Sequence, residues 1–289
     1  MLELLLPSEL FLLVEKEYNA QRLNEIRIRL NSAVVVCVAG VNKHLSMGGS
    51  SIIATRQLID GILYRATHNS LYAFNEQIKQ GFVTYSGIRL GIAGRVIKEK
   101  DDLKTVKDIT SLNIRVPCVV KTSGQQIYSG LFGEQIYNTL VLSPPGAGKT
   151  SMLRDFASLL SRDSRMLNVL IADEREEITF NKNLTNVDVF LNCTKTFAFT
   201  NGIRSMRPDI IITDEIGTES DIHCIEQAIT CGVKVIATAH ANNLQDLSNK
   251  KNMKYLLDMG LFERFIVLST RSGIGTLEGV YDSAFSKIF

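Results

Sequence analysis

The segment 143–150, with the sequence S-P-P-G-A-G-K-T, constrains this chain more than any other because it has the spacing of a P-loop. In such a loop a glycine-rich turn joins a strand to a helix. Consecutive backbone N–H groups then face one anion, and the helix N-terminus adds partial positive charge. The flanks agree, because 138–143 is a short apolar run typical of a buried parallel strand and 151–160 has helical spacing of apolar residues. The sequence therefore predicts a strand–loop–helix unit that binds a nucleoside triphosphate.

The individual positions of this loop have distinct predicted tasks. Lys149 is predicted to reach the β- and γ-phosphates of ATP, and the hydroxyl of Thr150 to hold Mg²⁺. Ser143 stands where the consensus G-x-x-x-x-G-K-T has its first glycine, but the Pro-Pro-Gly that follows supplies turn chemistry of its own. A glycine-rich turn that binds nothing is the alternative, and Gly-Lys-Thr at this place argues against it. The predicted nucleotide-binding residues are Pro145, Gly146, Ala147, Gly148, Lys149, Thr150 and Ser151.

A second acidic motif follows the P-loop at the distance that one or two strand–helix units require. The run 209–215, D-I-I-I-T-D-E, is an apolar strand that ends in two acids, which is the Walker B pattern. Asp214 is predicted to reach the Mg²⁺ shell through water, and Glu215 is the natural general base or orienter of the attacking water. A strand that ends in acids is a weak signal alone and a strong one after a P-loop.

Two further predicted strands end in polar residues, at 173–177 (D-E-R-E-E) and 237–242 (A-T-A-H-A-N). Ligands of open α/β sheets bind at the carboxyl ends of the strands, so chemistry is expected at these tips. Glu174 is a candidate catalytic acid, with a helix N-terminus that favours negative charge as the alternative. His240 is a candidate sensor of the γ-phosphate, with a satisfied polar residue at a strand end as the alternative.

Composition limits the class of protein. Apolar residues make up 45% of 289 residues, enough for a sizeable core and for two domains. The longest apolar run, 33–40, is far shorter than the roughly 20 residues that cross a bilayer, and the start of the chain carries Glu3, Pro7 and Glu9 and no basic leader. The cysteines are odd in number and form no C-x-x-C pair, so we expect reduced thiols in a cytosolic protein; they are Cys37, Cys118, Cys193, Cys224 and Cys231.

The periodicity predicts two domains, an α+β domain at 1–124 and an α/β P-loop domain at 125–289. In the first we expect a hairpin of 25–30 with 34–38, helices at 55–67 and 70–80, and strands at 82–85 and 88–97. A polar loop at 98–108, an extended segment at 111–120 and a hinge at 122–124 follow. In the second we expect strands at 138–143, 168–173, 187–191, 210–213 and 233–237, then a hairpin of 265–269 with 275–281.

The P-loop half resembles the secretion-type ATPases, the hexameric motors of type II and type IV secretion and of pilus assembly. The resemblance rests on the order of the P-loop, the acidic box at 173–177, G-I-R-S-M-R-P-D-I-I-I-T-D-E at 202–215 and A-T-A-H-A-N at 237–242. It implies a RecA-like P-loop NTPase core. Those motors typically have Gly-Glu at Walker B, whereas this chain has Asp214-Glu215, which leaves open which acid is the base.

The N-terminal half is similar to the stage III sporulation protein AA family of endospore formers. The segments that carry this similarity are 71–96, L-Y-A-F-N-E-Q-I-K-Q-G-F-V-T-Y-S-G-I-R-L-G-I-A-G-R-V, and I-T-S-L-N-I-R-V at 109–116. The resemblance implies a mother-cell ATPase, peripheral at the cytoplasmic face of a membrane channel complex between mother cell and forespore. It also implies a homo-oligomer, most simply a hexamer, with membrane channel proteins as partners.

A ring of P-loop domains commonly needs an arginine from the neighbouring subunit. In secretion ATPases such arginines come from the N-terminal domain and linker, which here offer Arg89, Arg95 and Arg115. Arg204 and Arg207 are candidates within the same chain, with ordinary helix-surface residues as the alternative. The charge agrees with such packing, since residues 1–125 have 16 basic and 11 acidic side chains (+5) and residues 126–289 have 16 and 19 (−3).

Two other functions compete with an ATP-hydrolysing motor. The first is a nucleic-acid-binding or nucleic-acid-stimulated ATPase, which the mildly basic N-terminal half favours. Single-strand grooves usually add aromatic platforms, but aromatics are 7% of the chain, and those of this half fit a core period: Tyr64, Tyr72, Phe74, Phe82 and Tyr85. The second is a scaffold that binds ATP for assembly and hardly turns over, against which the complete set of Lys149, Asp214 and Glu215 argues.

Overall fold

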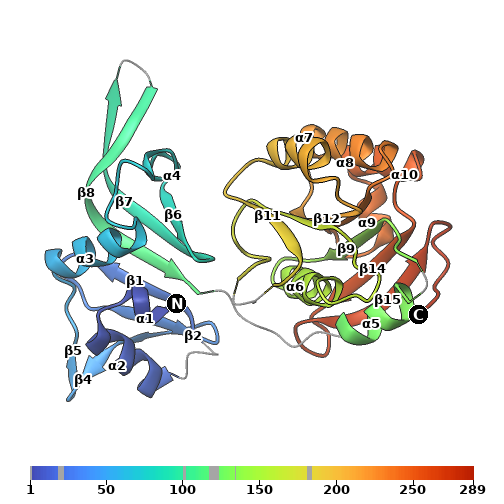
Figure 1. Ribbon diagram of the computed structural model, residues 1–289. Coiled ribbons are helices and arrows are strands. Elements are labelled where there is room, and N and C mark those ends of the chain that lie inside the picture. Colours follow the sequence, from blue (N-terminus) through green and yellow to red (C-terminus); the bar gives the residue numbers. More distant parts are fainter. Residues whose placement is uncertain (1, 19–22, 100–101, 117–123, 134, 181–183) are drawn as a thin grey trace. The chain divides into compact units, whose positions relative to one another are not determined.

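The computed structural model describes the chain except for residues 1, 19–22, 100–101, 117–123, 134 and 181–183, and it divides into two compact units (Figure 1). The units are Met1–Val119 and Val120–Phe289, a division five residues before the predicted one. Of the hinge predicted at 122–124, two residues lie outside the described part, and Gly124 begins a helix. In the described part of the chain no helix is long and apolar enough to cross a membrane.

The first unit is built on a six-stranded antiparallel sheet of order β3-β2-β1-β8-β7-β6. Its strands are β1 (Leu23–Arg29), β2 (Val35–Val38), β3 (Val41–His44), β6 (Phe82–Tyr85), β7 (Ile88–Glu99) and β8 (Asp102–Arg115). A small separate ladder joins β4 (Ser46–Met47) and β5 (Ser50–Ser51). The helices are α1 (Leu2–Leu5), α2 (Ser8–Tyr18), α3 (Arg56–Ala66) and α4 (Asn75–Lys79). The predicted hairpin of β1 with β2 is confirmed by its antiparallel pairing.

The prediction of a loop at 98–108 is wrong, because β7 and β8 form one long hairpin there (Figure 1). Val96 pairs with Val106 and Ile97 with Thr105. Several side chains of this arm are exposed, Val96 at 48% among them, so no burial imposes a period-two apolar pattern on the sequence. Backbone hydrogen bonds between β7 and β8 hold this hairpin arm together, and such bonds produce no apolar pattern in the sequence. The helices α1 and α2 were not predicted either, and α4 is shorter than the predicted 70–80.

The second unit contains a seven-stranded sheet of order β11-β10-β12-β13-β9-β14-β15, parallel except for its last strand. The strands are β9 (Thr139–Ser143), β10 (Val169–Asp173), β11 (Val187–Leu191), β12 (Ile210–Glu215), β13 (Lys234–His240), β14 (Arg264–Ser269) and β15 (Thr276–Asp282). The helices are α5 (Gly124–Leu131), α6 (Lys149–Leu160), α7 (Lys195–Met206), α8 (Glu219–Thr230), α9 (Leu244–Ser248) and α10 (Lys251–Asp258). Every strand predicted in this half is present, with ends displaced by at most a few residues.

Helices cover both faces of this sheet, and alternate residues of each strand enter two separate cores (Figure 1). In β12, Ile210 and Ile212 join the core that contains α5 and α6, whereas Ile211 joins the core of α7 and α8. Side chains on both faces of a parallel strand are therefore buried, which explains the continuous apolar runs in the sequence. Each fully buried isoleucine contributes about 1.5–3 kcal/mol relative to exposure.

The strand order determines which strand tips meet. β13 lies between β9, which leads into the P-loop, and β12, which ends in the two acids. In this register His240 pairs with Ser143, and Glu215 pairs with Thr238. Since all these strands are parallel, their carboxyl ends lie on one edge of the sheet, and His240 lies between the P-loop and the Walker B acids.

Candidate active site

The P-loop occupies the turn between β9 and α6 and depends on glycine at two positions. Gly146 has φ 73° and Gly148, the residue before α6, has φ 98°, a left-handed backbone that side chains disfavour. A Cβ on Gly148 would also lie 3.3 Å from backbone atoms of Gly275, whose N–H donates to the carbonyl of Ala147 (N···O 3.2 Å). The turn between β14 and β15 therefore packs against the P-loop and helps to set its shape.

Lys149 is the first residue of α6, and its side chain is buried at the sheet edge. Its Nζ donates to the carbonyl of Ser143 (3.0 Å) and lies 2.7 Å from Nδ1 of His240. Burial lowers the pKa of Lys149, Glu215 opposes the change and Lys250 adds to it, so that the resulting pKa is about 8. The ammonium is thus held in place at a cost in hydration, a cost that a phosphate anion would offset.

His240 joins the P-loop lysine to a Walker B acid. Its Nε2 lies 2.9 Å from Oε2 of Glu215 while its Nδ1 faces Lys149. If the lysine donates to Nδ1, the ring proton is on Nε2, so the same neutral tautomer accepts from Lys149 and donates to Glu215. Lys250 donates to the backbone carbonyl of His240. The structure therefore brings together residues of the P-loop, β12 and β13. His240 is a satisfied polar residue at a strand end and at the same time links Lys149 to Glu215, so both interpretations stay open.

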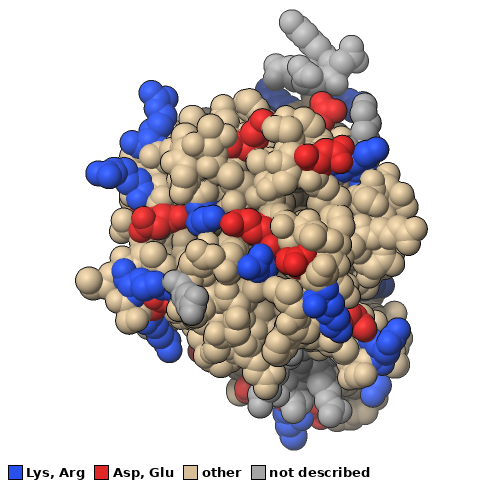
Figure 2. Space-filling view, turned by 90° about the vertical axis from the view of Figure 1, so that its right-hand side faces the viewer, with Lys and Arg blue, Asp and Glu red and all other residues tan. Residues whose placement is uncertain are grey.

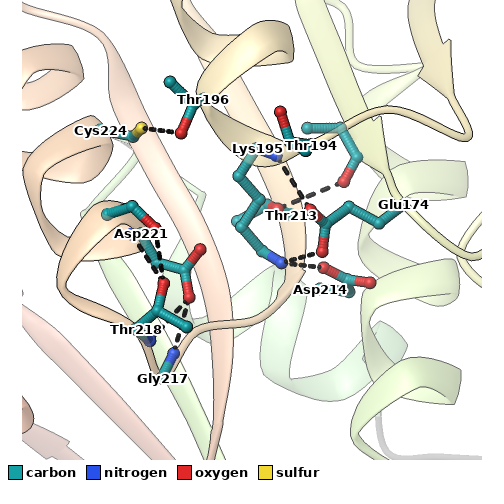
Figure 3. Close-up of polar contacts among 12 residues, drawn as sticks. Glu174, Thr194, Lys195, Thr196, Thr213, Asp214, Gly217, Thr218, Asp221 and Cys224 are labelled. Atoms are coloured by element: carbon teal, nitrogen blue, oxygen red, sulfur yellow. Dashed lines mark hydrogen bonds and ion pairs between the residues drawn. The ribbon is translucent and has the colours of Figure 1, made fainter. Parts of the chain in front are cut away.

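Asp214, the other acid of the pair, is held by a lysine from α7 (Figure 3). Its Oδ1 lies 2.8 Å from Nζ of Lys195, which also lies 2.6 Å from Oε2 of Glu174. Burial raises the pKa of Asp214, Lys195 opposes the rise, and the negative charges of Glu174 and Asp173 add to it, so that the resulting pKa is about 6. Burial alone would lower the pKa of Lys195, but the two carboxylates outweigh it and raise that pKa.

The acidic box after β10 shapes a turn and supplies Glu174 to the site. Asp173 is fully buried and accepts hydrogen bonds from the backbone N–H groups of Glu177 and Thr179 (both 2.9 Å) and from the Thr179 hydroxyl (2.8 Å). The residues after Asp173 form a turn and not a helix. No helix begins at these acids, but Glu174 accepts from the N–H of Lys195 at the start of α7 (3.0 Å), so the alternative of a carboxylate at a helix N-terminus stays open for Glu174.

The structure does not bring Arg204 and Arg207 together with the other predicted residues. α7 begins with Lys195 at the carboxyl edge, and its 12 residues lead away from it by about 18 Å. Arg207 caps the far end of the helix with φ 48° and lines a hollow with Asp209 and Lys234 at the amino edge of the sheet. The motif R-S-M-R-P-D thus lies beside Walker B in sequence but at the opposite end of β12.

The site contains residues that the sequence analysis missed. Lys195 has no motif around it and reaches the site only because α7 begins beside β12. Lys250 reaches it through the segment after β13. Arg271 belongs to the turn that packs against the P-loop and lies 3.8 Å from Glu278, and Arg175 is exposed next to Glu174. Lys195 and Lys250 could have been predicted only from the order of the strands in the sheet.

The candidate arginines of the first unit all lie on its longest strands. Arg89 stacks over the ring of Phe82 at 4.0 Å, and Arg95 forms an exposed ion pair with Asp108 at 3.4 Å. Arg115 is exposed at the end of β8. Each lies within Met1–Val119, so the contribution of any of them to a P-loop site stays a prediction.

The residues at the carboxyl edge fit the groups that the motifs predict. Hard oxygen donors from one or two side chains, with phosphates and water, are typical of Mg²⁺ sites, and the Thr150 hydroxyl and the Asp214 carboxylate are such donors. Glycines at left-handed φ let the loop backbone approach an anion, and the N-terminus of α6 faces the same place. Of the five cysteines, the four in the described part of the chain are free thiols, as expected, while Cys118 lies outside it.

Solved structures of secretion ATPases have a similar fold. The ATPase DotB of Legionella pneumophila is 12% identical and aligns over 91% of this chain and 76% of its own, with a TM-score of 0.55. The pilus retraction motor PilT with bound ADP is also 12% identical, over 88% of this chain and 76% of its own, with a TM-score of 0.60. These likenesses show that the chain has the α/β, RecA-like fold of the secretion ATPases.

The sequence also matches a family along almost its whole length. Stage III sporulation protein AA of Bacillus subtilis (strain 168) is 35% identical over 271 residues, which cover 90% of this chain and 87% of that protein. The family model described as sporulation stage III, protein AA, matches residues 2–288. The chain therefore belongs to the sporulation stage III protein AA family.

Proposed function

We propose that this protein is an ATP-hydrolysing motor of the secretion type. The observation that carries the proposal is the contact from Lys149 through His240 to Glu215, with Asp214 at the adjacent strand position. A phosphate-binding lysine at the start of α6 meets a candidate base and a candidate metal-binding acid of β12 at one sheet edge, with His240 of β13 between them. Such a set is what in-line phosphoryl transfer to water requires.

In the proposed reaction each residue has one role. The P-loop amides and Lys149 bind the β- and γ-phosphates, and Thr150 and Asp214 hold Mg²⁺, which neutralises charge on the phosphate oxygens when it is bound. Glu215 orients the attacking water and accepts its proton, because its side chain is 40% exposed whereas that of Asp214 is 11% exposed. His240 then reports the state of Lys149 to Glu215 through its two ring nitrogens.

The biological setting that we propose rests on the family and the fold. A secretion-type motor would act as a homo-oligomeric ring, most simply a hexamer, docked on channel proteins at the cytoplasmic face of the mother-cell membrane. An arginine of the neighbouring subunit would complete each site and raise the rate by roughly 10³–10⁵. Arg89, Arg95 and Arg115 of the first unit are candidates for this role, and Arg175 and Arg271 border the site within one chain.

Steady-state ATP hydrolysis by the purified protein over a concentration series tests the proposal. We expect specific activity to rise with protein concentration, because a site completed by a neighbour is active only in the oligomer. Lys149→Ala is the blank and loses at least 10²-fold in rate, since the phosphates lose their main cation. Tight ATP binding without turnover at any concentration, with and without a channel partner, would favour the scaffold and contradict the motor.

A nucleic-acid-stimulated ATPase is a second candidate, favoured by one observation. Tyr72 is 92% exposed and Tyr64 is 58% exposed, so the prediction that the aromatics of this half fit a core is wrong for these two. Exposed aromatic rings can stack on bases. On the face drawn in Figure 2, acidic and basic side chains are interspersed. Stimulation by single-stranded oligonucleotide that salt weakens would favour this candidate.

A further inference from the structure

Lys195 has a place in the site that no motif explains. Its side chain is 5% exposed, and its ammonium joins two carboxylates that follow different strands, Glu174 after β10 and Asp214 in β12 (Figure 3). The backbone N–H of Lys195 donates to the other oxygen of Glu174 at 3.0 Å. One carboxylate therefore binds both ends of the lysine, which fixes the start of α7 against the edge of the sheet.

The carboxylates around Lys195 require a positively charged partner. Asp214 is almost fully buried, and the negative charges of Glu174 and of the buried Asp173 both act on it, while Lys195 is the ammonium that contacts Asp214 and Glu174. Two carboxylates in one poorly hydrated place do not both stay charged without a positive partner. Carboxylate oxygens are also the ligands that Mg²⁺ and Mn²⁺ prefer. The ammonium thus has the position and the chemistry of a monovalent substitute for a divalent metal.

Ions can reach this place from solvent. The carboxylates of Glu174 and Asp214 line a hollow together with Lys195, Glu215 and Thr218 at the carboxyl edge. The lysine enters it from the first turn of α7, which is capped by the hydroxyl of Thr194 (O···N of Phe197 3.3 Å). A flexible four-carbon stem on a fixed helix end lets the ammonium move while the backbone stays.

We propose that Lys195 is the resident counter-ion of Asp214, which neutralises Asp214 and Glu174 in the nucleotide-free protein and so keeps Mg²⁺ from binding alone. Metal binding then depends on the phosphates of the nucleotide, because only their additional negative charge favours a divalent cation beside the lysine. Lys195 is in this view a positioning residue that couples metal binding to nucleotide binding. The inference rests on the proposed function in one respect, that Asp214 is the metal-holding acid.

Thermal unfolding without nucleotide, in EDTA and in excess Mg²⁺ or Mn²⁺, tests this role. The native protein is expected to melt at the same temperature with and without the metal. Lys195→Met, which removes the charge from a stem of similar shape, melts lower in EDTA and gains several degrees on addition of either metal, because the two carboxylates lose the ammonium that contacts both. Lys195→Arg keeps the charge and is expected to stay insensitive to metal.

Two further variants make the result specific. Asp214→Asn combined with Lys195→Met is expected to lose the metal response, because one of the two carboxylates is gone. Lys234→Met breaks a 2.8 Å ion pair with Glu263 at the amino edge and is the control for loss of a lysine, with no response expected. If Lys195→Met does not fold in EDTA, folding on addition of Mg²⁺ is the expected outcome, and Lys195→Gln repeats the comparison.

The outcomes separate this inference from the proposed function. Equal stabilisation of the native protein by Mg²⁺ without nucleotide would overturn it, as would Lys195→Met and Lys195→Gln that fold and ignore both metals. The measurement needs no hydrolysis. A native protein that fails to bind ATP would contradict the proposed motor. The metal response of the Lys195 variants is measured without nucleotide, so it would still test the role of Lys195.

Discussion

The two edges of the seven-stranded sheet differ in the main contacts that their polar side chains make. At the carboxyl edge charged side chains contact one another, as Lys149, His240 and Glu215 do. At the amino edge, beside the ion pair of Lys234 with Glu263, polar side chains bind backbone groups. The side-chain carbonyl of Asn138 accepts from the N–H of Val235 at 3.0 Å. In the same way, the carboxylate of Asp209 accepts from the N–H of Asn168 at 2.7 Å.

This difference suggests that the residues of the carboxyl edge serve function and those of the amino edge serve stability. A side chain that accepts from a buried backbone N–H satisfies a group that must stay paired, so it stabilises the strands. Side chains that bind one another can exchange partners for phosphate, water or metal. We therefore expect substitutions at the carboxyl edge to change activity more than stability, and those at the amino edge to do the reverse. The predictions below test that division.

The largest expected effect is that of Glu215→Gln on ATP hydrolysis. Glutamine keeps the size and the contact with His240 but cannot accept a proton, so the rate should fall by roughly 10²–10⁴. ATP binding should persist, and the trapped nucleotide should stabilise the oligomer. Single-turnover hydrolysis and equilibrium binding of labelled ATP measure the two separately. Unchanged turnover would assign the base to Asp214 or another group, and a strictly monomeric variant with bound ATP would contradict an interfacial site.

A smaller loss is expected from alanine at the P-loop glycines, and the two positions should differ. Gly148→Ala introduces left-handed strain of about 1–2 kcal/mol and also a contact at 3.3 Å with the backbone of Gly275. At Gly146 the strain is similar, but nothing lies within 4 Å of the added Cβ. ATP affinity, measured by calorimetry, should fall about tenfold for Gly146→Ala and further for Gly148→Ala. Equal losses would show that the β14–β15 turn does not shape the loop.

At the amino edge, Asn138→Ala should reduce stability and leave hydrolysis per folded molecule unchanged. It leaves the buried N–H of Val235 without its acceptor, which costs about 1–3 kcal/mol. Denaturant unfolding measures the loss, and ATPase assays below the transition measure activity. Lys234→Met is the matched control, because its ion pair is partly exposed and worth about 0–1 kcal/mol. A variant of Asn138 that is stable but inactive would contradict the division between the edges.

The same contrast explains what the sequence could predict. The P-loop and Walker B acids were found because their chemistry lies in short contiguous motifs beside apolar strands. Lys195 was missed because its partners are 21 and 19 residues away and depend on β12 lying beside β10. Arg207 was misplaced because sequence distance to Asp214 does not reveal that a strand separates them. The β7–β8 arm was missed because backbone pairing without burial leaves no periodic pattern.

The smallest expected effect is a pH dependence of the free energy of unfolding, which links stability to function at Lys149. Its pKa in the folded protein is about 8, below the ordinary 10.5, so between these values the unfolded chain binds more protons. The free energy of unfolding should therefore rise with pH there, by about 1 kcal/mol between roughly pH 7.5 and 9. Lys149→Met lacks the group and should lack the rise.

Thermal or denaturant unfolding of the nucleotide-free protein and of Lys149→Met at several pH values measures this difference. Saturating ATP should abolish the rise in the native protein, because a phosphate beside the ammonium favours its charged form and returns the pKa toward its ordinary value. Parallel pH profiles of the two proteins without nucleotide would show that the buried lysine carries no cost. The carboxyl edge would then have no more cost in stability than the amino edge, which would contradict the division of function and stability between them.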